Sequence, residues 1–163
     1  MPLPIAHGLL GASIIALVKP VISLKDWKPL LFGFILANCP DLDFIPAFLF
    51  GWQDFHRGIT HSLFFALFVG SGFFISSRRK DWRVPLAYSL AFLLHTALDF
   101  LSTTTGAVRL LEPFDDTPFT LGLISFSELP NGFMIADMLY FSLIEALIFV
   151  PIFLIALLIA RKL

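Results

Sequence analysis

The fold class follows from the stretch between Phe133 and Ala160, FMIADMLYFSLIEALIFVPIFLIALLIA. This stretch can cross a membrane as a helix, because about 20 apolar residues span a bilayer core of roughly 30 Å. Asp137 and Glu145 are its only charged residues, and Pro151 is expected to kink the helix. The sequence therefore predicts a transmembrane helix here.

The composition of the whole chain agrees with a membrane protein. Of its 163 residues, 58% are hydrophobic and 14% charged, and the mean hydropathy is +0.88, which excludes a water-soluble globule. The 12 acidic and 11 basic residues nearly cancel, which argues against a cationic nucleic-acid binder. A single cysteine, Cys39, excludes a disulfide framework and a cysteine-rich zinc site.

Four further apolar segments precede the long one: Ile5 to Val18, Leu30 to Phe50, His61 to Ile75, and Val84 to Leu101. The second is interrupted by Asn38-Cys39-Pro40-Asp41, where Pro40 is expected to force Cys39 out of helical geometry. The polar stretch from Ser102 to Gly132 is expected to be an ordered loop. We therefore predict an all-α, polytopic membrane bundle of about five hydrophobic segments, the second one broken, as a single integral membrane domain over residues 1–163.

Basic residues predict the orientation of this bundle. Five crossings would place the N-terminus on one side, called side A, and the C-terminus on the other, side B. Nine of the 11 basic residues then fall on side B: Lys19, Lys25, Lys28, Arg78, Arg79, Lys80, Arg83, Arg161 and Lys162. The positive-inside rule makes side B cytoplasmic. The alternative is a re-entrant second segment, which would distribute the basic loops over both faces.

Seven candidate metal ligands gather toward side A on this topology. They include all 4 histidines of the chain: His7, Asp41, Asp43, His56, His61, His95 and Asp99. Ionisable groups at membrane depth are costly unless they are paired, metal-bound or hydrated, so they indicate a functional site. The motif HTALD places His95 and Asp99 one helical turn apart on the same face. Imidazole and carboxylate ligands without thiolate favour zinc, as one or two ions, with manganese or iron as competitors.

Three other polar residues bear on this site. Arg57 lies between two candidate ligands, where its guanidinium would hold a phosphoryl group, bind lipid headgroups or pair with Asp54. Thr60 is expected to cap the helix that begins near His61. Glu145 falls near the bilayer midplane and is expected either to pair with a polar group of the bundle or to be protonated.

Several motifs together resemble a known family. They are His7 followed by Gly8 and Gly11, then NCPDLD, HRGITHS, LLHTALDFLSTTTG and RLLEPFDD. In these the chain resembles, up to about residue 127, the YdjM-type, LexA-regulated inner-membrane family, described as metal-dependent hydrolases. That family is similar to zinc-dependent phospholipase C and the P1-type nucleases, which are all-helical and use His and Asp ligands. The resemblance implies a hydrolase with the seven residues above as ligands, although the chain lacks the N-terminal tryptophan ligand and the full ligand count of the soluble enzymes.

The preferred hypothesis is a hydrolase of the inner (plasma) membrane that uses metal-activated water to cleave a phosphoester of a lipid or lipid-linked substrate at the periplasmic face. Asp41 or Asp43 would act as general base, and Arg57 would stabilise the developing charge. No nucleic-acid partner is expected. The alternative is a non-enzymatic membrane protein, either a divalent-metal carrier or a structural bundle pinned by its metal. A haem site ranks third, because the carboxylates prefer harder ions.

Overall fold

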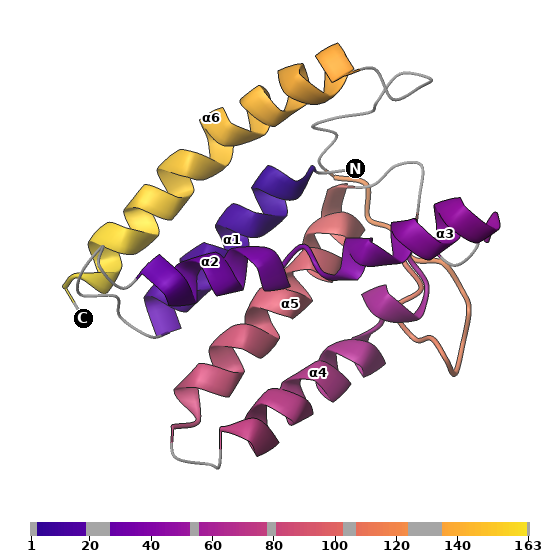
Figure 1. The fold of residues 1–163 in the computed structure, drawn as a ribbon, viewed down its shortest axis with the longest axis horizontal. Helices are drawn as coiled ribbons and strands as arrows, with labels where there is room; N and C mark the ends of the chain where they lie inside the picture. The colour runs from indigo at the N-terminus through magenta and orange to yellow at the C-terminus, as the bar shows by residue number, and fades with distance from the viewer. Residues whose placement is uncertain are drawn as a thin grey trace.

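The computed structural model describes residues 3–18, 27–52, 56–77, 81–102, 107–123 and 135–162. Within these ranges the regular structure is helical apart from one isolated bridge between Val108 and Phe119. Figure 1 shows the helices packed as a bundle, with α6 along one side. The elements are α1 (Pro4–Val18), α2 (Trp27–Leu36), α3 (Phe44–Phe50), α4 (Leu63–Ser76), α5 (Arg83–Ser102) and α6 (Ile135–Ala160), with the 3₁₀ turns η2 (Pro40–Asp43) and η4 (Ile59–His61).

The five predicted hydrophobic segments all form helices, which confirms the fold class. The helices α5 and α6 are long and apolar enough to cross a membrane, and α2 with η2 and α3 forms a pair bent by 44°. The helices α1 and α4 have 15 and 14 residues, so each is only about 21–23 Å long. They are shorter than a bilayer core of roughly 30 Å. The helix α6 is continuous through Pro151.

The break in the second segment does not arise as the sequence predicted. Cys39 keeps right-handed helical angles, with φ −62° and ψ −35°, so the expectation that Pro40 forces it out of helical geometry is wrong. The end of the helix instead tightens to 3₁₀ geometry, in which each N–H donates to the carbonyl three residues earlier. Asn38 N–H donates to the Ile35 carbonyl at 3.0 Å, and Cys39 N–H donates to the Leu36 carbonyl at 3.1 Å. This tightening redirects the chain and turns Asp41 and Asp43 toward the bundle.

The helix α1 lies at the centre of the bundle, in contact with α2, α5 and α6, while α4 packs against α5. The backbones of α1 and α2 approach closely because both carry glycine at the crossing. A Cβ atom on Gly11 would lie 2.5 Å from the Gly33 carbonyl oxygen and 2.5 Å from the Ala37 Cβ. The close crossing therefore brings the C-terminal end of α2 against the interior of the bundle.

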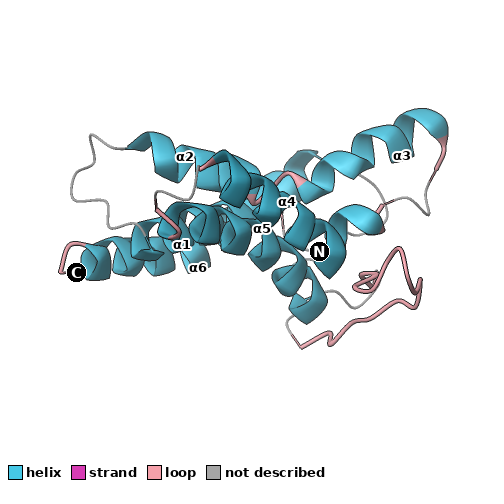
Figure 2. Cartoon of the chain, turned by 90° about the horizontal axis from the view of Figure 1, so that it is seen from below, coloured by secondary structure: helices cyan, strands magenta, loops and turns pink. Residues whose placement is uncertain are grey.

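Figure 2 shows α3 and the 107–123 loop projecting from one end of the bundle, away from the C-terminus. Backbone hydrogen bonds hold this loop in place. Leu63 N–H donates to the Leu110 carbonyl at 3.0 Å, and Leu121 N–H donates to the Phe100 carbonyl at 2.8 Å. The loop is therefore ordered against the start of α4 and the end of α5, as predicted for its described part.

The close crossing of α1 and α2 predicts that a methyl group added at Gly11 lowers the stability of the protein, whereas one added at an open glycine does not. Gly11→Ala should destabilise the protein by about 1–3 kcal/mol, because the new Cβ overlaps backbone. Gly72→Ala is the matched control, since a Cβ there meets nothing within 4 Å. Thermal unfolding in detergent should show a lower midpoint for Gly11→Ala alone. Equal midpoints for the two variants would contradict the crossing.

Candidate metal centre

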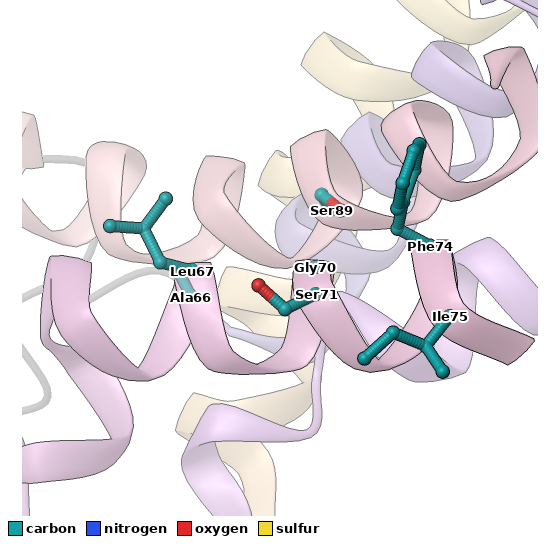
Figure 3. A pocket seen from close by; sticks show the side chains of 7 residues that line it. All are labelled: Ala66, Leu67, Gly70, Ser71, Phe74, Ile75 and Ser89. Carbon is teal, nitrogen blue, oxygen red and sulfur yellow. The ribbon is translucent and has the colours of Figure 1, made fainter.

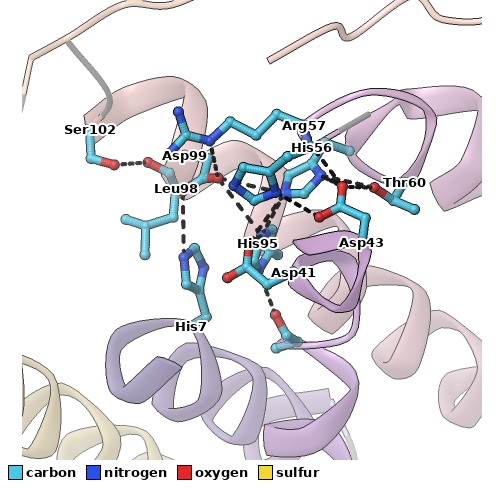
Figure 4. A network of polar contacts seen from close by, with 12 residues as sticks. His7, Asp41, Asp43, His56, Arg57, Thr60, His95, Leu98, Asp99 and Ser102 are labelled. Carbon is cyan, nitrogen blue, oxygen red and sulfur yellow. Dashed lines mark hydrogen bonds and ion pairs between the residues drawn. The ribbon is translucent and has the colours of Figure 1, made fainter. Parts of the chain in front are cut away.

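The structure brings all seven predicted ligands to one end of the bundle, as Figure 4 shows for the residues it labels. Four parts of the chain supply them. The helix α1 carries His7, the η2 turn carries Asp41 and Asp43, the segment 56–61 carries His56 and His61, and α5 carries His95 and Asp99. The bent second segment and the turn before α4 therefore add their histidines and aspartates to the HxxxD motif of α5.

Four of the seven form an inner group. Asp41, His61, His95 and Asp99 each offer one ligand atom, and these atoms all lie within 4.8 Å of one another. The Asp41 Oδ1 atom is 3.5 Å from His61 Nε2 and 3.4 Å from His95 Nε2. The Asp99 Oδ2 atom is 3.7 Å and 3.8 Å from the same two nitrogens. A tetrahedral zinc with bonds of about 2.0–2.1 Å places its ligand atoms about 3.3 Å apart, so the group fits such an ion.

The hydrogen bonding of His95 determines which of its nitrogens can bind a metal. Its Nδ1 atom lies 2.7 Å from the carbonyl oxygen of Ala37. A carbonyl only accepts hydrogen bonds, so Nδ1 carries the proton and the neutral ring has its lone pair on Nε2. That Nε2 atom faces His61 Nε2 at 3.0 Å. His95 is therefore in the tautomer that a metal ligand requires.

The same reasoning applies to His61. The Thr60 hydroxyl donates to Asp43 Oδ2 at 2.5 Å, which uses its single proton. His61 Nδ1, 3.1 Å from Thr60 Oγ1 and 3.3 Å from Asp43 Oδ2, is then the donor to these oxygens. In a neutral ring the lone pair again lies on Nε2, so two lone pairs and two carboxylates face one another. A proton would satisfy one pair of these atoms, whereas a metal ion would bind both lone pairs and a carboxylate oxygen together.

Asp43 and His56 lie outside the inner group. The buried Asp43 carboxylate pairs with His56 Nδ1 at 2.7 Å and accepts the Arg57 backbone N–H at 3.1 Å, in addition to the Thr60 hydroxyl. These contacts fasten the segment that carries His61 and orient its ring. Carboxylates behind a ligating histidine have this role in metal sites.

The predicted role of Thr60 as a helix cap is wrong. Ser62 caps α4 instead, because its hydroxyl oxygen accepts the Phe65 N–H at 3.1 Å. Ser62 directly precedes the apolar helix, and this position is the sequence signal that identifies the cap. Thr60 does not cap α4, and its hydroxyl group instead contacts both Asp43 and His61.

His7 borders the inner group from α1. Its ring stacks on His95 with a centroid distance of 3.9 Å, and its Nε2 atom lies 3.5 Å from Asp99 Oδ1. Both ring nitrogens of His7 and the Asp41 Oδ1 atom are buried without a hydrogen-bond partner among the described residues. Buried polar atoms are rarely left in this state, so they indicate a ligand that would satisfy them.

Arg57 crosses the site with a strained backbone. Its φ angle is 63°, the left-handed region that is uncommon for residues other than glycine. Its N–H donates to Asp43 and its carbonyl accepts the Arg109 N–H at 3.2 Å, which holds this conformation. The Arg57 Nε atom lies 3.8 Å from Asp99 Oδ2. Asp54, the alternative partner considered from the sequence, lies outside the described residues.

Fold and site together define a polytopic helical membrane protein with a buried candidate metal centre. The chain belongs to the YdjM inner membrane protein family, whose sequence model matches residues 1–162. This match confirms the resemblance and extends it beyond residue 127. Inner membrane protein YbcI of Escherichia coli (strain K12) is 36% identical over 98 residues, 53% of this chain and 54% of that protein. The chain thus spans about half the length of this curated relative, and no solved structure matches it significantly.

The inner group predicts a graded response of metal binding to mutation. His95→Ala should abolish stoichiometric binding of a transition metal, because it removes an inner ligand. His56→Ala should weaken zinc binding by about 10–100-fold, because His56 acts through Asp43. Metal analysis of the detergent-purified protein and zinc titration would measure both effects. A wild type without transition metal, and variants of unchanged stability, would contradict the assignment.

Proposed function

We propose that this protein is a metal-dependent hydrolase of the inner membrane that cleaves a phosphoester of a lipid or lipid-linked substrate. The observation that carries the proposal is the pair of Nε2 atoms facing each other at 3.0 Å, with Asp41 and Asp99 oxygens beside them. Zinc is the ion best suited to this mixture of imidazole and carboxylate. When bound, it supplies Lewis acidity toward a phosphoryl oxygen and makes water more acidic.

The exposure of the inner residues supports different roles for them, namely metal binding and proton transfer. His61, His95 and Asp99 have side chains that are 0% exposed, whereas Asp41 is 17% exposed. Three ligands leave a position open in a catalytic zinc site. We therefore assign ion binding to the three buried residues and assign proton removal from the attacking water to Asp41. Asp43, with both its oxygens engaged, positions His61.

Arg57 is the group that would stabilise charge on the phosphoryl group. Its side chain runs over the site in Figure 4 and brings the guanidinium next to Asp99, and it is 12% exposed, so it is accessible from outside the site. A guanidinium presents planar donors to phosphate oxygens and keeps its charge at all working pH values. The hydrogen bonds of the Arg57 backbone to Asp43 and Arg109 keep it in this place.

The lipid substrate is inferred from the apolar surface around the site. In the α3 segment, directly after Asp43, Phe48 is 76% exposed, and in the loop that binds Arg57, Phe114 is 81% exposed. A groove beside this loop is lined by Leu63, Phe64, Leu67, Leu110, Leu111, Phe114 and Asp115. It shares Leu67 with a second groove, of about 430 Å³, between α4 and α5, shown in Figure 3. Together they form an apolar track along α4 that would accept acyl chains.

We place the site at the periplasmic face. Among the described basic residues, those near helix ends remote from the site are Lys28, Arg83, Arg161 and Lys162. They begin α2 and α5 and follow α6, at ends that point away from α3 and the 107–123 loop (Figures 1 and 2). The positive-inside rule makes these ends cytoplasmic, which puts the N-terminus and the site on the outer side.

A structural metal is the second candidate, favoured by the burial of three of the four inner residues. Such an ion would tie η2 and η4 to α5 without performing chemistry. Removal of metal would then lower the unfolding temperature, and no lipid product would depend on the inner residues.

The division of roles predicts that metal binding and activity separate at Asp41. Asp41→Asn should keep stoichiometric metal but lose at least about 100-fold in activity, because the amide cannot take a proton. Asp99→Asn is the matched change in an inner ligand and should lose metal as well. Mass spectrometry of a total lipid extract incubated with each protein would measure the products. Identical profiles for wild type and Asp41→Asn would exclude lipid hydrolysis, even with metal bound.

Arg57→Gly tests the guanidinium separately from the backbone. Glycine accepts a φ of 63° readily, so the variant should fold as well as the wild type and keep its metal. Formation of the lipid product in the same lipid-extract assay should fall about 10²–10³-fold, the usual cost of removing one group that stabilises an oxyanion. Full activity in a folded Arg57→Gly protein would remove Arg57 from the mechanism.

A further inference from the structure

We propose that Glu145 is a positioning residue, which caps the N-terminus of α1 from α6 and thereby holds His7 at the metal centre. Glu145 is 1% exposed, although it lies within the apolar helix α6. Its Oε1 atom accepts the backbone N–H of Leu3, and its Oε2 atom accepts the N–H of Ala6 at 3.1 Å. Both oxygens of this carboxylate are therefore used by the first turn of α1.

The need for such a cap follows from where α1 begins relative to α6. The helices α1 and α6 are in contact and run in the same direction in Figure 1. Glu145, level with the start of α1, lies ten residues after Ile135, so α6 begins about 15 Å before α1. The first N–H groups of α1 consequently lie well past the start of α6, beside a helix that is long and apolar enough to span a membrane. Unsatisfied N–H groups are costly in hydrocarbon.

The sequence of α1 provides no cap of its own. Its first turn contains no acidic residue, and Pro4 has no N–H to satisfy. A carboxylate at this position accepts hydrogen bonds from the first N–H groups of the helix and also interacts favourably with the positive end of the helix dipole. Glu145 thus supplies from another helix what α1 lacks, which explains a buried acid in a membrane span.

The consequence for the metal centre passes through one residue. Ala6, which donates to Glu145, is followed by His7, whose ring stacks on His95 at 3.9 Å. Neither nitrogen of His7 has a hydrogen-bond partner among the described residues, and its one polar contact printed there is the pairing of Nε2 with Asp99 Oδ1 at 3.5 Å. The ring can keep these two contacts only if α1 stays in position, and Glu145 fixes that position at the first turn.

Two readouts test this proposal on the full chain in detergent, and Co²⁺ is the metal probe. Glu145→Ala should speed hydrogen–deuterium exchange in residues 3–7, and should change the visible spectrum of bound Co²⁺ and weaken its binding about tenfold, a typical cost of losing a supporting residue. His7→Ala should change the spectrum similarly, and the double variant should show no further loss, because both changes act through His7. Glu145→Gln, which retains one acceptor oxygen, should restore part of the affinity.

Phe149→Ala is the matched control on α6. Phe149 is buried against Ala6, so its loss removes more packing than the loss of Glu145 without removing a carboxylate. It should lower the unfolding temperature and leave the Co²⁺ spectrum unchanged. Exchange in residues 3–7 that is the same in Glu145→Ala and wild type would overturn the capping role. An unchanged spectrum in Glu145→Ala, or an equal change in Phe149→Ala, would overturn the link to His7.

The proposed positioning of His7 rests on the metal centre, but the cap does not. If the wild-type protein bound no Co²⁺, the proposed function and the positioning role would both be overturned. The exchange measurement would still decide whether Glu145 caps α1.

Discussion

Two imidazole nitrogens that face each other at 3.0 Å are the constraint on which the rest of the structure depends. On the far side of its ring, His95 Nδ1 faces the Ala37 carbonyl oxygen, and His61 Nδ1 faces oxygens of Thr60 and Asp43. In neutral rings both Nδ1 atoms therefore carry the proton, and both Nε2 lone pairs point to the centre. Two lone pairs and two carboxylate oxygens then meet in a largely buried space. In this environment electrostatic repulsion is weakly screened, and a cation at the centre relieves it.

The bundle around this centre is arranged to fix its histidines. The glycine crossing of α1 and α2 brings the end of α2 into the interior, where the Ala37 carbonyl meets His95. Asp43 ties the turn before α4 to the η2 turn and so places His61. These contacts involve backbone groups and side chains next to the candidate ligands. Metal sites commonly orient the residues that bind the ion in this way.

Much of the fold could be predicted from the sequence because apolar length decides membrane insertion. The helices α5 and α6 follow their predicted segments within two residues. The candidate ligands could be predicted because histidines and acids are rare in an apolar chain, and His95 with Asp99 sit one turn apart. The contact between His7 and this pair could not be predicted in detail, since it depends on how α1 packs against α5.

Other features were beyond the sequence for identifiable physical reasons. The Ala37 carbonyl is a backbone group, and no residue type marks it. Thr60 resembles a helix cap in sequence, and its link to Asp43 appears only when the two turns meet. The geometry at Cys39 departed from the usual effect of a following proline, because the tertiary context stabilised a 3₁₀ turn. Glu145 could be recognised as unusual, but its partners lie on a helix 139 and 142 residues away in sequence.

In the proposed function, imidazole and carboxylate groups bind one ion at this centre. X-ray absorption spectroscopy at the zinc edge of the purified, zinc-loaded protein tests it most directly. We predict a first shell of nitrogen and oxygen at about 2.0–2.1 Å, with the multiple scattering typical of two imidazoles. A shell containing sulfur, or one without imidazole scattering, would contradict it.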